Sequence, residues 1–355
     1  MRVAIDARAY FQRTGIARYT RGLVHALAAK NRRDEILLLI SDHHRPDEVS
    51  IDRPGVTVRV SRAPWLGGRA EQAQLSREVR AWRADVFHSL FPPAAIASVP
   101  SVVTIFDLTP LSHPHFHQPL VRRTFRAAAG RAVAQAARVV AISRATARAV
   151  KRHFPAAAVR THVIGAGLPP WVGAAHPAGR RRSGVMYVGT IEPRKNVPVV
   201  METARRLRQL GYRGTVTIVG KQGWGGYDVA GEAAALPNVR YRGYVSDATL
   251  RALYRRSAIL LCPSEVEGFG LPVLEAMAHG VLPLVSPDPA LREVVGDPSL
   301  VIDPHDPAAI AHAIVRWASN HDARERKVRR LAARARRADW SRVAQRVLRV
   351  YRQVA

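Results

Sequence analysis

Two glutamates eight positions apart, Glu267 and Glu275, are the residues whose spacing most clearly suggests chemistry. The first lies in a glycine-rich stretch, and the second lies in the second turn of a helix expected to start near Gly270. Free N–H groups at a helix N-terminus favour phosphate groups or sugar hydroxyls. The pair therefore predicts a site for a phosphorylated or polyhydroxylated ligand. The alternative is a surface turn with an ordinary helix cap.

A basic pair, Arg194 and Lys195, follows residues 185–189, an apolar run typical of a buried strand. A helix is expected to begin close to Asn196, so the pair would lie between a strand and a helix. Arginine can grip a phosphate through two parallel hydrogen bonds, and lysine acts as a compact positive charge. The position favours phosphate binding over the alternative of a solvated basic pair.

Alternating strands and helices must hold these residues in place. The chain opens with a strand at residues 2–8 and a helix at 16–29, joined by a polar loop that ends in Gly15. This order is typical of a Rossmann-type unit and places Gly15 near a bound phosphate, although the loop lacks G-x-G-x-x-G. Asp107 follows a strand at 101–106, and ligand-binding residues of such sheets lie at the carboxyl ends of strands. Asp107 is therefore a further site candidate.

Three histidines, His113, His115 and His117, alternate in the loop after Asp107. Histidines with this spacing could bind a metal ion. No acidic or cysteine ligand is adjacent, so we expect an acceptor-site or surface loop and no metal.

The order of the elements predicts two domains. A first series of strands and helices ends before a stretch rich in glycine, proline and alanine, and a second series follows it. We expect an N-terminal Rossmann-like domain at 1–168, a linker at 169–183 and a second Rossmann-like domain at 184–337. A last helix at 338–355 would cross back to the first domain. The predicted fold class is α/β, with two parallel sheets facing across a cleft.

The composition is that of a globular protein of more than one domain: 355 residues, 47% hydrophobic, with one cysteine, Cys262. No run of about 18 apolar residues occurs, and the N-terminus resembles a strand more than a signal peptide, so we expect a cytoplasmic protein. The formal net charge of +28 favours anionic partners. Aromatic residues make up only 6% and are not interleaved with basic ones, so we expect no nucleic-acid partner.

Six motifs, in this order and spacing, are highly specific together: TGIARYT (14–20), TIFDLTPL (104–111), VVAIS (139–143), YVGTIEPRKN (187–196), RGYVSDATLRALY (242–254) and SEVEGFGLPVLEAMAHG (264–280). With these motifs, the chain resembles the family-4 retaining glycosyltransferases of the GT-B fold over nearly its whole length. It looks most like the mannosyltransferase-like members that build O-antigen, exopolysaccharide or glycolipid chains.

The resemblance implies a role for each candidate residue. Arg194 and Lys195 would neutralise the donor pyrophosphate, Glu267 would bond hydroxyls of the transferred sugar, and Glu275 would hold the ribose. Asp107 would lie at the acceptor face, where Phe106 replaces a histidine that is frequent in the family. The catalytic residues implied are Arg194, Lys195, Glu267 and Asp107. The donor-binding residues implied are Gly15, Gly189, Thr190, Val245, Gly268, Phe269, Gly270, Leu271 and Glu275.

The implied reaction moves a sugar from a nucleotide-sugar donor to a glycan or lipid-linked acceptor with retention, and mannose from GDP-mannose is the first choice. No metal or other cofactor is expected, because Arg194 and Lys195 would stabilise the leaving phosphate. We expect their joint replacement to abolish most of the transfer and leave the fold intact. The alternatives are a UDP-sugar transferase, phosphorylase or epimerase of the same fold and, more distantly, a basic nucleic-acid-binding protein.

Two arginine-rich helices, at 69–83 and 122–131, suggest contact with an anionic membrane surface. Trp82 and Phe125 would supply apolar contact points. We therefore expect a peripheral position on the inner face of the membrane. The alternative is an ordinary solvated face rich in arginine.

Overall fold

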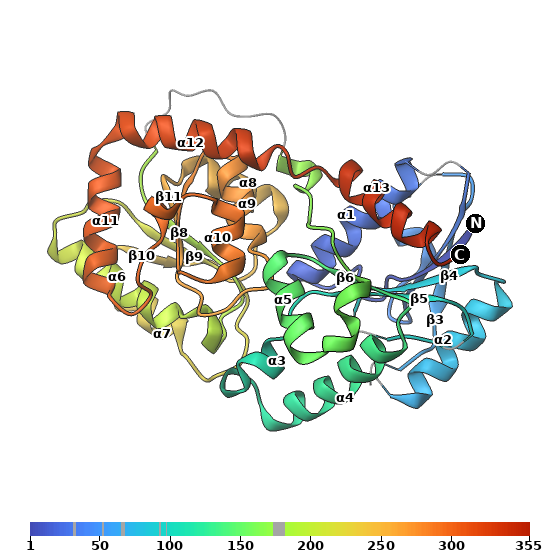
Figure 1. Cartoon of the computed structure of the whole chain (residues 1–355). Helices are drawn as coiled ribbons and strands as arrows, with labels where there is room; N and C mark the ends of the chain where they lie inside the picture. Colours follow the sequence, from blue (N-terminus) through green and yellow to red (C-terminus); the bar gives the residue numbers. More distant parts are fainter. Residues whose placement is uncertain (31–32, 52, 65–67, 92–93, 97, 173–181) are drawn as a thin grey trace. The chain divides into compact units, whose positions relative to one another are not determined.

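The structure is a computed structural model that describes residues 1–30, 33–51, 53–64, 68–91, 94–96, 98–172 and 182–355 (Figure 1). It divides into two compact units, one of Met1–Gly167 with Ala338–Ala355 and one of Leu168–Arg337. Most of the predicted linker, residues 173–181, lies outside the described residues.

The first unit is built on a seven-stranded parallel sheet in the order β3-β2-β1-β4-β5-β6-β7. Its strands are largely buried runs of apolar residues, as expected where helices cover both faces of a parallel sheet. The strands are β1 (Arg2–Asp6), β2 (Glu35–Ser41), β3 (Val56–Ser61), β4 (Val86–Ser89), β5 (Ser101–Ile105), β6 (Arg138–Ala141) and β7 (Thr161–Val163). The helices are α1 (Gly15–Lys30), α2 (Arg69–Ala81), α3 (Thr109–Ser112), α4 (Pro119–Gln135), α5 (Arg144–His153) and α13 (Trp340–Arg352).

The C-terminal helix α13 packs against α1 and completes this unit. The Trp340 ring lies so close to Gly22 and Gly167 that a Cβ atom at either glycine would clash with it. At the other end of the helix, the Tyr351 hydroxyl lies 2.6 Å from Nδ1 of the buried His88. Burial lowers the pKa of His88 to about 3, so this contact joins a neutral histidine to the helix.

The second unit contains a five-stranded parallel sheet in the order β10-β9-β8-β11-β12. The strand order reverses at β8, so the loops after β8 and β11 lie at the switch point where open α/β sheets bind ligands. The strands are β8 (Val185–Val188), β9 (Val216–Val219), β10 (Val239–Tyr241), β11 (Ile259–Cys262) and β12 (Leu282–Val285). The helices are α6 (Val197–Gln209), α7 (Val229–Ala234), α8 (Asp247–Arg256), α9 (Leu271–Ala278), α10 (Pro289–Val295), α11 (Pro307–Ser319) and α12 (His321–Ala335).

The predicted class of two Rossmann-like units with parallel sheets is confirmed. The predicted helix starts near Asn196 and Gly270 are also confirmed, because α6 begins at Val197 and α9 begins at Leu271. Gly270 has φ +99° and caps α9, a conformation that a residue with a side chain rarely adopts. A Cβ atom there would also lie 2.6 Å from Leu291.

Of the two expected apolar contact points, Trp82 is wrong and Phe125 is only partly covered. Trp82 follows α2 and is only 6% exposed, because it packs in the core with Leu75 and Val79. The Arg2 guanidinium also covers its ring at 4.5 Å from the centroid. Phe125 of α4 is partly buried, because one side of its ring packs against the neighbouring core cluster. Helical spacing showed that these aromatics share a helix with arginines, but only packing decides which face is covered.

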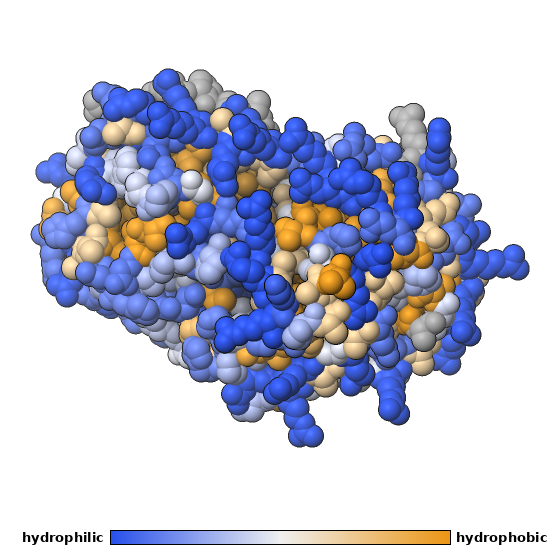
Figure 2. All heavy atoms as spheres, in the orientation of Figure 1, coloured by the Kyte–Doolittle hydropathy of each residue, from blue (hydrophilic) through white to orange (hydrophobic). Residues whose placement is uncertain are grey.

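None of the helices in the described parts of the chain has the length and apolar character needed to cross a membrane. Hydrophilic side chains cover most of the face visible in Figure 2, as the high net charge requires.

Candidate active site

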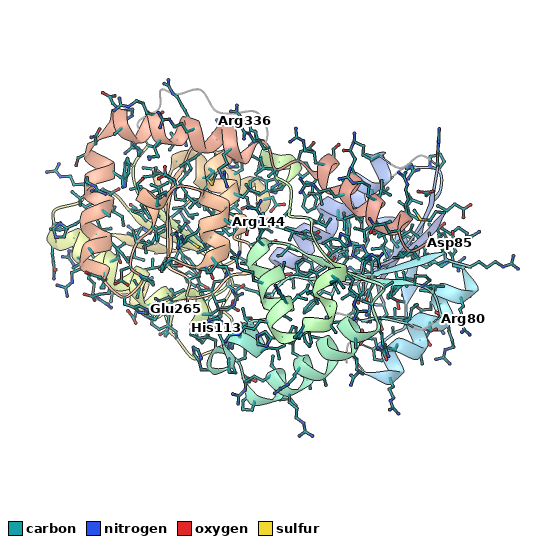
Figure 3. The ribbon with its side chains drawn as sticks, in the orientation of Figure 1. Arg80, Asp85, His113, Arg144, Glu265 and Arg336 are labelled. Atoms are coloured by element: carbon teal, nitrogen blue, oxygen red, sulfur yellow. The ribbon has the colours of Figure 1, made fainter. Side chains whose placement is uncertain are left out.

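The loops that follow β8 and β11 meet at the carboxyl edge of the second sheet, because these two strands are neighbours. The Glu265 backbone N–H donates to the Arg194 carbonyl oxygen at 2.8 Å. The Asn196 side-chain amide donates to Glu265 Oε1 at 3.1 Å and to the Pro304 carbonyl at 3.1 Å. Figure 3 labels Glu265 on the loop after β11. These bonds fix the basic loop against the glycine-rich loop.

Three predicted site residues come together here, although about 70 positions separate them in sequence. Lys195 Nζ bonds Glu267 Oε1, and Arg194 Nη1 lies 3.3 Å from Glu267 Oε2. Arg194 Nη2 also forms an ion pair with Glu192 Oε1 at 2.6 Å. The side chains of Arg194, Lys195 and Glu267 are 16%, 12% and 9% exposed, so all three are shielded and still reachable from solvent.

The ion pairs keep Glu267 ionised. Burial by itself would raise its pKa, but the charges of Lys195 and Arg194 outweigh burial and hold the pKa at about 2. A carboxylate in this state accepts hydrogen bonds and cannot act as a proton donor near neutral pH. Glu267 is therefore suited to receive hydroxyl groups beside two cations that can hold a phosphate.

Asp288 is a residue of this site that the sequence analysis missed. It follows β12, and its Oδ2 accepts the Glu267 backbone N–H at 3.2 Å. Its Oδ1 accepts the N–H groups of Ala290 and Leu291 at 2.8 and 3.0 Å, which caps α10. Burial raises its pKa to about 6, and the charge of Glu267 adds to the shift. The available sequence signal was an aspartate before a proline. This pattern is common at the start of a helix, and it does not predict the contact of Asp288 with Glu267.

Replacing Asp288 by asparagine is expected to change how stability depends on pH. The folded-state pKa of about 6 lies above the ordinary 3.8, so the protonated form stabilises the fold. That contribution is complete below about pH 4 and is lost as the pH rises through about 6. The melting temperature of the wild type should therefore rise relative to that of Asp288→Asn as the pH falls from about 7 to about 4. Glu267 loses its own contribution to stability below its ordinary pKa of 4.5, but it is present in both proteins, so the difference between them reports Asp288. A melting difference that is the same at every pH would contradict this assignment.

Glu275 lies on α9 and is fully buried. The Tyr254 hydroxyl donates to its Oε2 at 2.9 Å. A ribose hydroxyl that reached Glu275 would have to share the carboxylate with Tyr254 or replace it. The ribose role implied by the family resemblance stays a prediction.

The other predicted donor-binding residues of this unit lie at the same edge of the sheet. Gly189 and Thr190 follow β8, Val245 follows β10, and residues 268–271 lead into α9. The loop after β9 packs tightly here, because a Cβ atom at Gly220 would lie 1.8 Å from the Gly189 carbonyl oxygen. The structure gathers these residues at the carboxyl ends of parallel strands, and their contacts with a donor stay predictions.

Two predicted site residues, Gly15 and Asp107, belong to the first unit. Gly15 begins α1 after the first loop. Asp107 Oδ1 accepts both the backbone N–H and the hydroxyl of Thr109, at 2.9 and 2.7 Å. Thr109 in turn contacts His117 Nε2 at 3.0 Å. Asp107 thus orders the loop after β5, and its acceptor role stays a prediction. Within the described ranges, no three His, Cys, Asp or Glu side chains are grouped so that they could hold a metal ion.

Two sequence families match this chain, one in each half. Residues 13–171 match "Glycosyltransferase Family 4", and residues 176–337 match "Glycosyl transferases group 1". The O-antigen chain mannosyltransferase B of Escherichia coli is 34% identical over 171 residues, which is 47% of this chain and 45% of that protein. The phosphatidyl-myo-inositol mannosyltransferase of Mycobacterium leprae is 34% identical over 186 residues, 50% of this chain and 49% of that protein. These matches span about half the length of the relatives.

The whole chain also matches a solved structure. The sucrose-phosphate synthase of Thermosynechococcus elongatus superposes with a TM-score of 0.78 over 99% of this chain and 98% of its own. At 18% identity, this likeness establishes the fold alone.

Proposed function

The chain belongs to the glycosyltransferases, of family 4 in residues 13–171 and of group 1 in residues 176–337, and on that basis we propose a mannosyl transfer reaction. The donor is GDP-mannose, and the acceptor is a glycan or a lipid-linked saccharide of the cell surface. The configuration at the transferred carbon is retained. The observation that carries the proposal is the meeting of Arg194, Lys195 and Glu267 at the switch point of the second sheet.

The charges of this site fit the bond that breaks. Cleavage of the bond between sugar and pyrophosphate places negative charge on the phosphate and positive character on the sugar. Arg194, Lys195 and the N-terminus of α9 stabilise the phosphate, and such preorganised groups are among the largest contributions to catalysis. Glu267, ionised among the cations, orients hydroxyls of the sugar. The acceptor hydroxyl attacks from the face that the phosphate leaves, and a phosphate oxygen takes its proton, so no side-chain nucleophile is assigned.

Mannose is the proposed sugar because both curated relatives described above are mannosyltransferases and match at 34% identity. Arg194 and Lys195 supply the positive charge that a divalent metal would otherwise supply, so we propose that transfer needs no metal.

A thermal-shift panel tests the donor. The full chain is heated with GDP-mannose, GDP-glucose, UDP-glucose, UDP-N-acetylglucosamine and ADP-glucose, each at about 100 times its expected Kd, where binding stabilises by roughly 2.7 kcal/mol. The expected result is a clear rise in melting temperature with GDP-mannose, and release of GDP in EDTA once a lipid-linked saccharide is added. Stabilisation by a UDP-sugar alone would replace the proposed donor, and GDP release that requires added Mg²⁺ would overturn the metal-free reaction. Stabilisation by none of them would overturn the proposed function.

We also propose that the first unit rests on an anionic membrane surface, where a lipid-linked acceptor is found. The first turns of α4 carry exposed apolar side chains beside basic ones: Leu120 is 71% exposed and Val121 43%. Arg122, Arg123 and Arg126 lie in the same turns. Each basic residue near an anionic surface contributes about 1 kcal/mol.

The membrane proposal predicts salt-sensitive sedimentation with vesicles. The protein should co-sediment with vesicles of phosphatidylglycerol and phosphatidylcholine at low salt and be released near roughly 0.5 M salt, where screening is strong. Changing Arg122, Arg123 and Arg126 to serine should weaken this binding and leave donor binding unchanged. The matched control removes the same charge from the exposed face of α12 in the second unit, by Arg326→Ser, Arg329→Ser and Arg330→Ser. Equal binding to neutral and anionic vesicles, or equal loss in both variants, would contradict a docking surface on α4.

A further inference from the structure

We propose that Tyr254 is a positioning residue for donor binding, and that an aromatic column of Trp171, His279 and Tyr254 holds it in place. The column connects the segment that enters the second unit with the carboxylate of Glu275. This inference rests on the proposed function, because it assigns a partner to one of its donor-binding residues.

The column is continuous from Trp171 to Glu275. The rings of Trp171 and His279 stack with centroids 5.6 Å apart, and those of His279 and Tyr254 stack at 5.0 Å and 10°. The Tyr254 hydroxyl then donates to Glu275 Oε2 at 2.9 Å. His279 also bonds the Glu275 carbonyl oxygen through Nδ1 at 2.9 Å. Tyr254, His279 and Glu275 are at most 1% exposed, so the arrangement is internal.

The same end of α9 receives a second attachment. Arg182 Nη1 donates to the carbonyl oxygens of His279 and Gly280 at 2.6 and 2.8 Å. These carbonyls lie at the C-terminus of α9, where a positive charge is favourable. Trp171 and Arg182 lie on either side of residues 173–181, so both described ends of this segment are fixed to the helix that carries Glu275.

A buried carboxylate needs donors that fix its direction. The Tyr254 hydroxyl occupies one oxygen of Glu275 and thereby restricts the rotation of the carboxylate. A stacked tyrosine is a rigid hydrogen-bond donor, because its side chain has only two torsions. Here the stacked rings of His279 and Trp171 restrain Tyr254 further. Loss of the hydroxyl leaves the ring stacked and removes this restraint on the carboxylate, together with the bond of the hydroxyl to the Pro272 carbonyl oxygen at 3.3 Å. Tyr254→Phe therefore separates the hydrogen bonds of the tyrosine from its packing.

The test compares ligands that differ only in the ribose. Binding of GDP, UDP and their 2′,3′-dideoxy analogues to the full-length protein is measured by calorimetry. For the nucleotide that binds, the ratio of the dideoxy Kd to the ribose Kd reports what the ribose hydroxyls contribute. We expect a ratio on the order of ten or more in the wild type and close to one in Tyr254→Phe. Kinetically, Tyr254→Phe should raise the donor KM and change kcat little.

Two further variants and a control complete the design. Trp171→Ala should lower the ratio of the two Kd values to between those of the wild type and Tyr254→Phe. Trp171→Phe keeps a stacking ring and should restore the ratio. Tyr212→Phe removes another tyrosine hydroxyl of the same unit, which accepts the Gly184 N–H at 3.2 Å, and should leave the ratio unchanged. Melting temperatures of all variants show whether each is folded at the temperature of the binding experiment.

The outcomes distinguish the inference from the function on which it rests. Failure of the wild type to bind either nucleotide overturns both. Binding with a wild-type ratio near one removes Glu275 from the ribose site and the inference with it, while donor binding stands. A large wild-type ratio that persists in Tyr254→Phe, with both affinities shifted equally, shows a structural role only and overturns the inference alone. A normal ratio in Trp171→Ala overturns the role of the column.

Discussion

Replacing Arg194 and Lys195 together by alanine is expected to lower the rate of sugar transfer by about 10²–10³-fold, the usual cost of removing electrostatic stabilisation from a transition state. Both cations lie beside Glu267 at the switch point, where the donor pyrophosphate is proposed to bind. The same change should weaken the binding of GDP, because the nucleotide carries the phosphates.

The structure revises the expectation that this variant keeps its stability. Glu267 is 9% exposed, and its charge is balanced by the two residues that are removed. A buried charge left without its partners costs about 3–5 kcal/mol. The double variant should therefore melt at a lower temperature, and adding Glu267→Gln should recover much of the loss without restoring activity.

Initial rates, GDP affinity and melting temperature are measured on the same preparations. The matched control is Arg329→Ala with Arg330→Ala, which removes two exposed arginines from α12 and should leave all three values near those of the wild type. Near wild-type turnover in the Arg194 and Lys195 variant would falsify the assignment of these cations to the leaving phosphate.

The second large effect is expected from Glu267→Gln. Glutamine keeps the size of the side chain and one acceptor oxygen but loses the charge that faces Lys195. We expect kcat to fall by about 10²-fold, because the sugar loses a charged hydrogen-bond partner in the transition state. Affinity for GDP should change by less than about threefold, because GDP lacks the transferred sugar and the cations remain.

Glu265→Gln is the matched control for this prediction. Glu265 lies on the same loop, and its Oε1 accepts a hydrogen bond from Asn196 that glutamine can also accept. It should leave kcat near the wild-type value. Equal losses of kcat in both variants would indicate a general disturbance of the loop. A parallel loss of GDP affinity in Glu267→Gln would indicate that Glu267 acts on the phosphates and not on the sugar.

Local properties of the sequence were enough to predict the strands and the site loops. The apolar run at residues 185–189 predicted a buried strand, and Gly270 predicted the start of α9. The family resemblance implied that Arg194, Lys195 and Glu267 share one donor site, and the structure brings them together because residues that follow the strands of a parallel sheet gather at one edge. Their ion pairs are the detail that the structure adds.

Contacts between distant elements were decided only by tertiary packing. Asp288 supports Glu267 because β12 lies beside β11, and Tyr254 meets Glu275 because α8 packs near α9. Trp82 shares its helix region with arginines but lies in the core. The sequence determined which residues carry charge and where α6 and α9 begin, since those properties depend on neighbouring residues. Which side chains meet across the sheet depends on strand order and packing, and these are set by burial over the whole chain.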